Sequence, residues 1–206
     1  QSESCHFTYS LLPPGEYDCR VVVRDLETGS TAVGKESVLV PEASAAPLVL
    51  LPPLLLRPGA DVNYFGVQTK PGVPAGAGAP SLAALFPFDP ERFSPLVGGL
   101  ATGSREVHAM VICGFDGGRG SGPALSFSLM ESLSGPEFPV PHEVVSSQMA
   151  SQDGEGRSRL AVLVRVGLPA PGPGSYVLKV KAEDPATGAA AESVQGEAQA
   201  VLAEGG

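Results

Sequence analysis

Short runs of the chain alternate between apolar and polar residues with a period of two. In RSRLAVLVRVGL (157–168), Leu160, Val162 and Val164 occupy every second position. In SYVLKVKAE (175–183), the larger apolar residues share one face of an extended chain, and both lysines fall on the other. This spacing is typical of antiparallel strands that bury one face. No window shows a sustained period of 3.6 residues, so the pattern predicts an all-β protein.

The other predicted strands are bounded by glycine, proline and other turn-forming residues. They span residues 5–12, 17–27, 33–41, 61–69, 105–115, 124–132, 142–149 and 189–202. In PLVLLPPLLLRPG (47–59) the prolines exclude a helix, so this apolar run is predicted to be extended. A long irregular stretch with a Gly/Ala/Pro-rich insert is predicted at about 70–104, and large apolar residues are sparse in its first part, 70–84.

One phrase of the sequence occurs twice. Residues 12–29 read LPPGEYDCRVVVRDLETG, and residues 174–188 read GSYVLKVKAEDPATG. The two copies align without a gap, and each follows a proline-rich turn and precedes a further predicted strand. The pairs that match are Gly15 and Gly174, Tyr17 and Tyr176, Val21 and Val180, Asp25 and Asp184, Thr28 and Thr187, and Gly29 and Gly188.

The repeat predicts one structural unit used twice, the last two strands of a β-sandwich. Its first glycine lets the chain bend sharply between sheets. The tyrosine that follows can bury its ring and return its hydroxyl to upstream backbone, as in the tyrosine corner of immunoglobulin-like sandwiches. The aspartate and the last glycine have the composition of a reverse turn that closes a hairpin. The alternative is that a hairpin-rich protein reuses such turns independently.

The positions of the two copies predict two domains. The second copy closes a complete domain at 45–206, expected to be an immunoglobulin-like or fibronectin-like antiparallel β-sandwich. The first copy comes so early that residues 1–44 can hold only the terminal strands of an incomplete immunoglobulin-like domain, a three-strand partial unit. We expect an upstream part of the same polypeptide or a protein partner to complete it.

Charge and hydropathy exclude two classes of partner. The chain has 206 residues and a formal net charge of −9, with only 13 basic residues. An acidic chain gains little from a phosphate backbone, so nucleic-acid binding is not expected. The most apolar run, 46–56, is about half of the roughly 20 residues that a spanning helix needs, and Pro52-Pro53 splits it. No membrane span is therefore expected.

The three cysteines show no spacing typical of a metal site. Cys5 and Cys19 flank Pro13-Pro14 almost symmetrically, so they could face each other across neighbouring strands and form a disulfide. Free thiols are the alternative. Cys113 lies in the apolar run VHAMVICGF and is expected in the core.

Groups that could perform catalysis do not converge in the sequence. His6, His108 and His142 lie in three separate predicted strands, beside no serine or cysteine motif. We therefore expect no enzyme, no catalytic residue, no metal, no cofactor and no small-molecule substrate.

The least ordinary stretch is FPFDPERF, residues 86–93. Its aromatic residues Phe86, Phe88 and Phe93 could fill a hydrophobic pocket of their own domain or one of a partner. These three phenylalanines are therefore candidate interaction residues.

The chain resembles the C-terminal region of secreted bacterial proteins related to von Willebrand factor type A domains. The resemblance rests on LPPGEYDCRVVVRDLETGSTAVGKESVLVP, PLVLLP, FPFDPERF and LPAPGPGSYVLKVKAEDPATG, and it covers nearly the whole chain. It implies tandem immunoglobulin-like modules and a secreted, periplasmic or cell-surface location. The type A domain itself is absent, and so is its DxSxS metal-site motif, so metal-dependent adhesion is not implied.

These observations predict a non-enzymatic structural or protein–protein interaction module. One alternative is an accessory subunit docked on a larger complex, including a membrane-associated one. An alternative of another class is a ligand- or carbohydrate-binding domain of an extracellular enzyme. That class is weakened because the chain has no tryptophan and no clustered acids.

Overall fold

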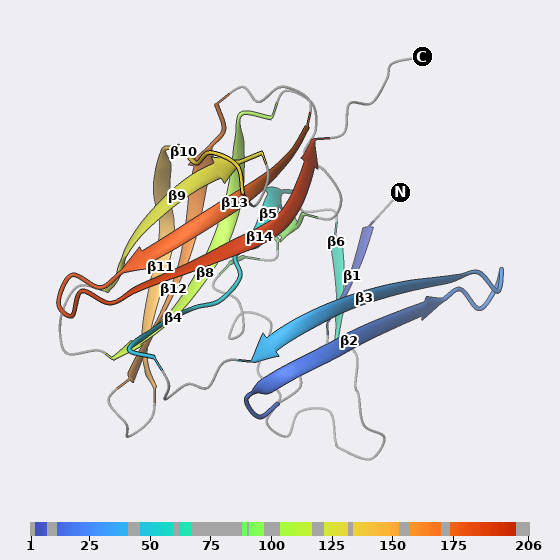
Figure 1. The fold of residues 1–206 in the computed structure, drawn as a ribbon. Helices are drawn as coiled ribbons and strands as arrows, with labels where there is room; N and C mark the ends of the chain where they lie inside the picture. Colours follow the sequence, from blue (N-terminus) through green and yellow to red (C-terminus); the bar gives the residue numbers. More distant parts are fainter. Residues whose placement is uncertain are drawn as a thin grey trace. The chain divides into compact units, whose positions relative to one another are not determined.

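The computed structural model describes residues 3–7, 12–40, 46–59, 62–66, 88–89, 91–96, 104–116, 122–131, 134–152, 157–169 and 174–200. Within these ranges the chain forms strands and turns and no helix, so the predicted all-β class is confirmed (Figure 1). The chain divides into two compact units. The main unit comprises residues 1–8 and 47–206, and the small unit comprises 9–46.

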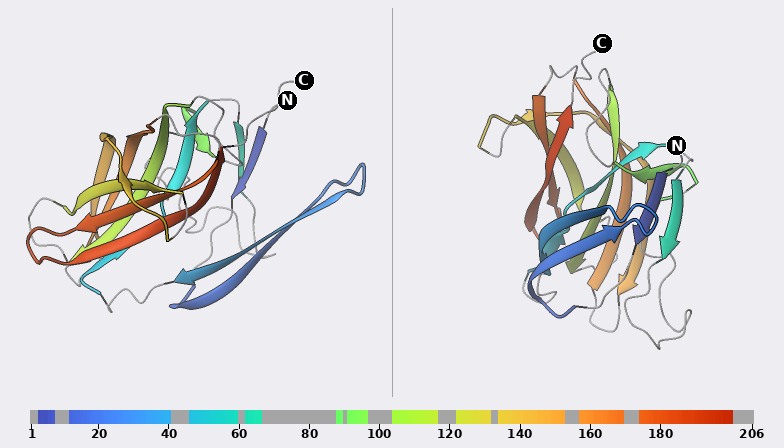
Figure 2. Two further views of the ribbon diagram at one scale, coloured as in Figure 1. Left: turned by 45° about the horizontal axis from the view of Figure 1, so that its top comes forward. Right: turned by 90° about the vertical axis from the view of Figure 1, so that its right-hand side faces the viewer.

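The main unit is a sandwich of two antiparallel sheets (Figures 1 and 2). The four-stranded sheet has the order β10 (Phe138–Pro139), β9 (Ala124–Met130), β13 (Gly174–Glu183), β14 (Ala190–Ala200). The six-stranded sheet has the order β11 (His142–Gln152), β12 (Arg157–Gly167), β8 (Glu106–Asp116), β5 (Leu54–Pro58), β7 (Phe93–Pro95), with β4 (Leu48–Leu50) also paired to β8. Residues 190–200 therefore form a strand, as predicted for 189–202.

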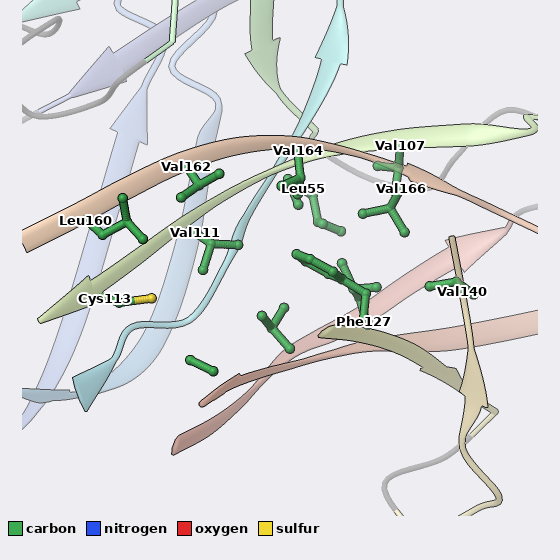
Figure 3. Close-up of a cluster of buried hydrophobic side chains, with 14 of the residues drawn as sticks. Leu55, Val107, Val111, Cys113, Phe127, Val140, Leu160, Val162, Val164 and Val166 are labelled. Carbon is green, nitrogen blue, oxygen red and sulfur yellow. The ribbon is translucent and has the colours of Figure 1, made fainter. Parts of the chain in front are cut away.

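The principal core lies between these two sheets. Figure 3 shows side chains of β8 and β12, among them Val111, Val162 and Val164, pointing toward Phe127 of β9. The prediction that β12 buries one face only is wrong: Val162 and Val164 belong to this core, and Leu163, on the opposite face, belongs to a second cluster. Strand β12 thus buries apolar residues on both of its faces.

The second cluster covers the other face of the six-stranded sheet. It comprises Leu56, Phe88, Phe93, Met110 and Leu163. Two of these residues come from the stretch 88–93, which was predicted to be part of an irregular insert. That prediction is wrong for β7, which pairs with β5, and most of 70–104 lies outside the described residues.

The proline-split run 47–59 is extended, as predicted. Both β4 and β5 pair antiparallel with β8, and Pro52-Pro53 interrupts the ladder between them. Proline has no backbone N–H to donate, so two successive prolines leave this part of the chain without the donors that would continue the ladder.

The small unit is a two-stranded antiparallel ribbon of β2 (Gly15–Arg24) and β3 (Thr31–Val40). The prediction of a third strand beside them is wrong. Strand β1 (Glu3–Phe7) instead pairs in parallel with β6 (Val62–Gly66) and belongs to the main unit. The proline-rich turn after β1 is compatible with either pairing, because local turn residues do not specify a strand's partner.

Candidate functional site

The two copies of the repeated phrase form the same turn, atom by atom. In the first copy, Gly29 N–H donates to the carbonyl oxygen of Asp25 at 2.9 Å, and the Thr28 hydroxyl donates to Asp25 Oδ2 at 2.7 Å. In the second, Gly188 N–H donates to the Asp184 carbonyl at 2.8 Å, and the Thr187 hydroxyl donates to Asp184 Oδ2 at 2.7 Å.

The turn explains why glycine ends both phrases. Gly29 and Gly188 have φ angles of 74° and 71°, in the left-handed region that glycine adopts without steric cost. Strands β2–β3 and β13–β14 leave these turns in the same register, with Arg24 opposite Thr31 and Glu183 opposite Ala190. The repeat is therefore one hairpin turn built twice, with an aspartate and a glycine at the same places in both copies.

The Asp184 turn makes the stability of the main unit depend on pH. The Thr187 hydroxyl, and after it the Ala186 N–H, hold the pKa of Asp184 below its usual 3.8. A lowered pKa stabilises the fold above the usual value, and this contribution is lost as pH falls through the lowered one. At pH 7, Asp184→Asn should lower the melting temperature of the main unit by about 3–6 °C. The difference should shrink toward pH 2, as calorimetry would show.

Asp25→Asn is the matched control for that prediction. Asp25 accepts the equivalent bond from Thr28, which also lowers its pKa, but it belongs to the small unit. Asp25→Asn should therefore leave the melting temperature of the main unit unchanged at every pH. Equal shifts from the two variants would contradict the assignment of Asp184 to the main unit's stability.

The tyrosines of the two phrases lie near the starts of equivalent strands. The Tyr17 hydroxyl donates to the Pro13 carbonyl oxygen at 2.8 Å, the upstream backbone bond that a tyrosine corner makes, although the ring is only half-buried. Tyr176 is half-buried and packs against the core between the sheets. Gly15 and Gly174 open β2 and β13, as the alignment requires.

The two copies differ in what covers them. One face of the ribbon, called here the ribbon face, carries Tyr17, Cys19, Val21 and Val23 of β2 with Ala32, Gly34, Glu36 and Val38 of β3. Val21 is 62% exposed and Val23 is 56% exposed. Their counterparts Val180 and Ala182 are both fully buried in the sandwich core. The side that packs in the second copy is thus open to water in the first.

The other side of the ribbon is mixed: it exposes Val22, Val33 and Leu39 but also carries polar and charged residues. The Ser37 hydroxyl donates to Asp18 Oδ1 at 2.8 Å across the two strands. Arg20 of β2 stands directly opposite Lys35 of β3. Like charges placed opposite each other on a sheet repel, and within the described part of the chain no ion pair involves Arg20, Arg24 or Lys35.

The phenylalanines of FPFDPERF do not form an interaction surface where the structure describes them. Phe88 and Phe93 are buried in the second cluster with Leu56. Phe86 lies outside the described residues. Of the two predicted roles, packing on their own domain holds for Phe88 and Phe93, because the outer face of the six-stranded sheet is itself apolar.

The cysteines have contrasting surroundings. Cys19 is a free, exposed thiol on the ribbon face, so the predicted disulfide to Cys5 is not formed in this structure. The side chain of Cys5 lies outside those described. Cys113 is buried in the core, as predicted, and burial raises the pKa of its thiol to about 12.

Alkylation should distinguish these thiols. With a pKa of about 12, Cys113 carries about one thiolate per ten thousand molecules at pH 8, and the core also shields it. Iodoacetamide should modify Cys19 in the native chain and reach Cys113 only after denaturation, as peptide mass mapping would show. Modification of both at similar rates would contradict the burial of Cys113.

His108 is buried beside Phe93, with ring centroids 4.9 Å apart. Burial lowers its pKa, and Glu106 acts in the opposite direction. Its Nδ1 has no hydrogen-bond partner among the described residues. An open hollow beside it is lined by Pro58, Gly59, Glu91, Arg92 and Phe93. The His142 ring is tilted against Phe127, with ring centroids 4.7 Å apart, and the side chain of His6 lies outside those described.

The described residues do not gather three or more histidine, cysteine, aspartate or glutamate side chains into a metal-binding group. Nor do they include a helix with the length and apolar character required to cross a membrane. No protein-family model matches the chain, and no curated protein matches it. The ribbon face is distinguished by its exposed Val21 and Val23, whose counterparts in the second copy are buried.

Proposed function

We propose that the chain is a non-enzymatic structural and protein–protein interaction module, and that the ribbon face is its contact surface. The proposal rests on the contrast between two equivalent positions: Val21 is exposed in the first copy, whereas Val180 is buried in the second. An isolated two-stranded ribbon is marginally stable in water. Contiguous exposed apolar residues on a soluble protein mark interaction sites. A partner that covers the ribbon face would stabilise the ribbon and would remove its apolar side chains from water.

The tyrosine corner of Tyr17 and the two-sheet packing support an immunoglobulin-like character for the modules. The sequence resemblance to secreted proteins related to von Willebrand factor type A domains supports a secreted, periplasmic or cell-surface location. An accessory subunit docked on a larger complex would use the same surface.

Hydrogen exchange of the intact chain tests the proposal. In dilute monomer, backbone amides of β2 and β3 should exchange at least tenfold faster than those of β13 and β14, because their side chains are open to water. The dye 8-anilinonaphthalene-1-sulfonate should bind the native chain, and Val21→Asp should weaken that binding. Equal protection of both hairpins, with no dye bound, would mean that the ribbon face is covered and would refute the proposal.

A further inference from the structure

The ribbon also differs from its second copy along one edge. In the sandwich, β13 pairs with β14 on one edge and with β9 on the other. In the ribbon, β2 pairs with β3, and no described strand pairs with its other edge. An unpaired edge presents backbone N–H and C=O groups that can bind another strand.

Strand β9 shows which side chains suit this edge. It places apolar residues opposite the core-facing positions of β13, with Phe127 opposite Val180 and Leu129 opposite Leu178. Ser128 lies between them, opposite Lys179. Through the alignment of the two phrases, Val180, Leu178 and Lys179 correspond to Val21, Cys19 and Arg20.

The charge at the edge sets a second requirement. Lys179 is neutralised by Glu137 and Glu192, each at 2.8 Å from its Nζ. Glu137 lies beside β9, whose Ser128 hydroxyl donates to it. Arg20 has the equivalent place on β2 but stands opposite Lys35. An acid brought in from the open edge would relieve that repulsion.

We infer that the open edge of β2 binds an added antiparallel β-strand of a protein partner, with apolar residues facing Cys19, Val21 and Val23 and an acidic residue facing Arg20. Main-chain hydrogen bonds supply affinity in such strand addition, and the alternating side chains supply specificity. The inference rests on the proposed function and names the chemistry of its partner.

A peptide derived from β9 provides the probe. It has the sequence ALSFSLMES of residues 124–132, carries Ser128→Glu and bears a fluorescent label. The intact chain should bind it with saturation by about 1 mM in fluorescence anisotropy, and hydrogen exchange of residues 15–24 should slow. Val21→Asp in the chain should weaken binding at least tenfold. Arg20→Glu should reverse the preference, so that the chain binds the Ser128→Lys peptide better.

Backbone methylation distinguishes an added strand from a peptide lying on the ribbon face. Alternate amides of a strand point to opposite edges. Of two peptides N-methylated at the odd or at the even positions, only one should lose binding. Loss from neither would overturn edge addition.

Failure of the inference can be told from failure of the proposed function. If the peptide does not bind but the ribbon exchanges rapidly and binds the dye, the interaction surface stands and the added-strand inference is wrong. If the chain instead forms a dimer that Val21→Asp disrupts, a second copy is the occupant and the inference is again overturned. A ribbon fully protected in dilute monomer refutes both.

Discussion

Val180→Asp is expected to unfold the main unit, whereas the same change at the matching position, Val21→Asp, is expected to leave its unfolding transition unchanged. Val180 is fully buried between Phe127 and Ser193 of its neighbouring strands. An unpaired carboxylate there would cost about 4 kcal/mol or more. That loss is comparable with the total stability of many domains, about 5–15 kcal/mol.

The two positions form an internal control, because they occupy equivalent places in one repeated hairpin. Val21 is 62% exposed, so a carboxylate there stays in water. Circular dichroism during urea denaturation would measure the main transition of each variant. A native-like transition for Val180→Asp, or a loss of the main transition for Val21→Asp, would contradict the assignment of one copy to the core and the other to an open surface.

Phe93→Ala is expected to destabilise the main unit by about 3–5 kcal/mol, the usual cost of truncating a buried aromatic side chain. Phe93 is only 8% exposed and lies in the second cluster with Leu56 and Met110. Its ring also contacts the buried His108. Removing the ring would leave a cavity on the outer face of the six-stranded sheet and expose the imidazole.

The control for this prediction is Phe138→Ala. Phe138 lies in β10 and is 49% exposed, so its truncation should cost much less, about 1 kcal/mol. Urea denaturation would give both values. The midpoints of the variants can be compared directly if the unfolding free energy depends on urea concentration with the same slope in each. If Phe93→Ala denatured like the wild type, the ring would not be part of the core, and a role for it in binding a partner would have to be reconsidered.

The character of the strands and the repeated turn could be predicted from the sequence because they depend on neighbouring residues. A period of two reports which face of a strand is buried, as in β13, where Leu178, Val180 and Ala182 are buried and Lys181 and Glu183 are not. The bonds that build each turn join residues at most five positions apart, from Asp25 to Ser30 and from Asp184 to Ala189. Two short phrases that share the aspartate, the threonine and the glycine therefore form the same turn.

Only the tertiary structure decided which strands pair and what covers them. The parallel pairing of β1 with β6 joins residues far apart in sequence, and no turn signal encodes it. The burial of Phe93 depends on Leu56, Met110 and Leu163 from three other strands. The candidate site has the same origin: one phrase forms a buried hairpin in the sandwich and an exposed one in the ribbon. Local sequence sets the shape of a hairpin, but burial depends on the surfaces that the rest of the chain, or a partner, brings against it.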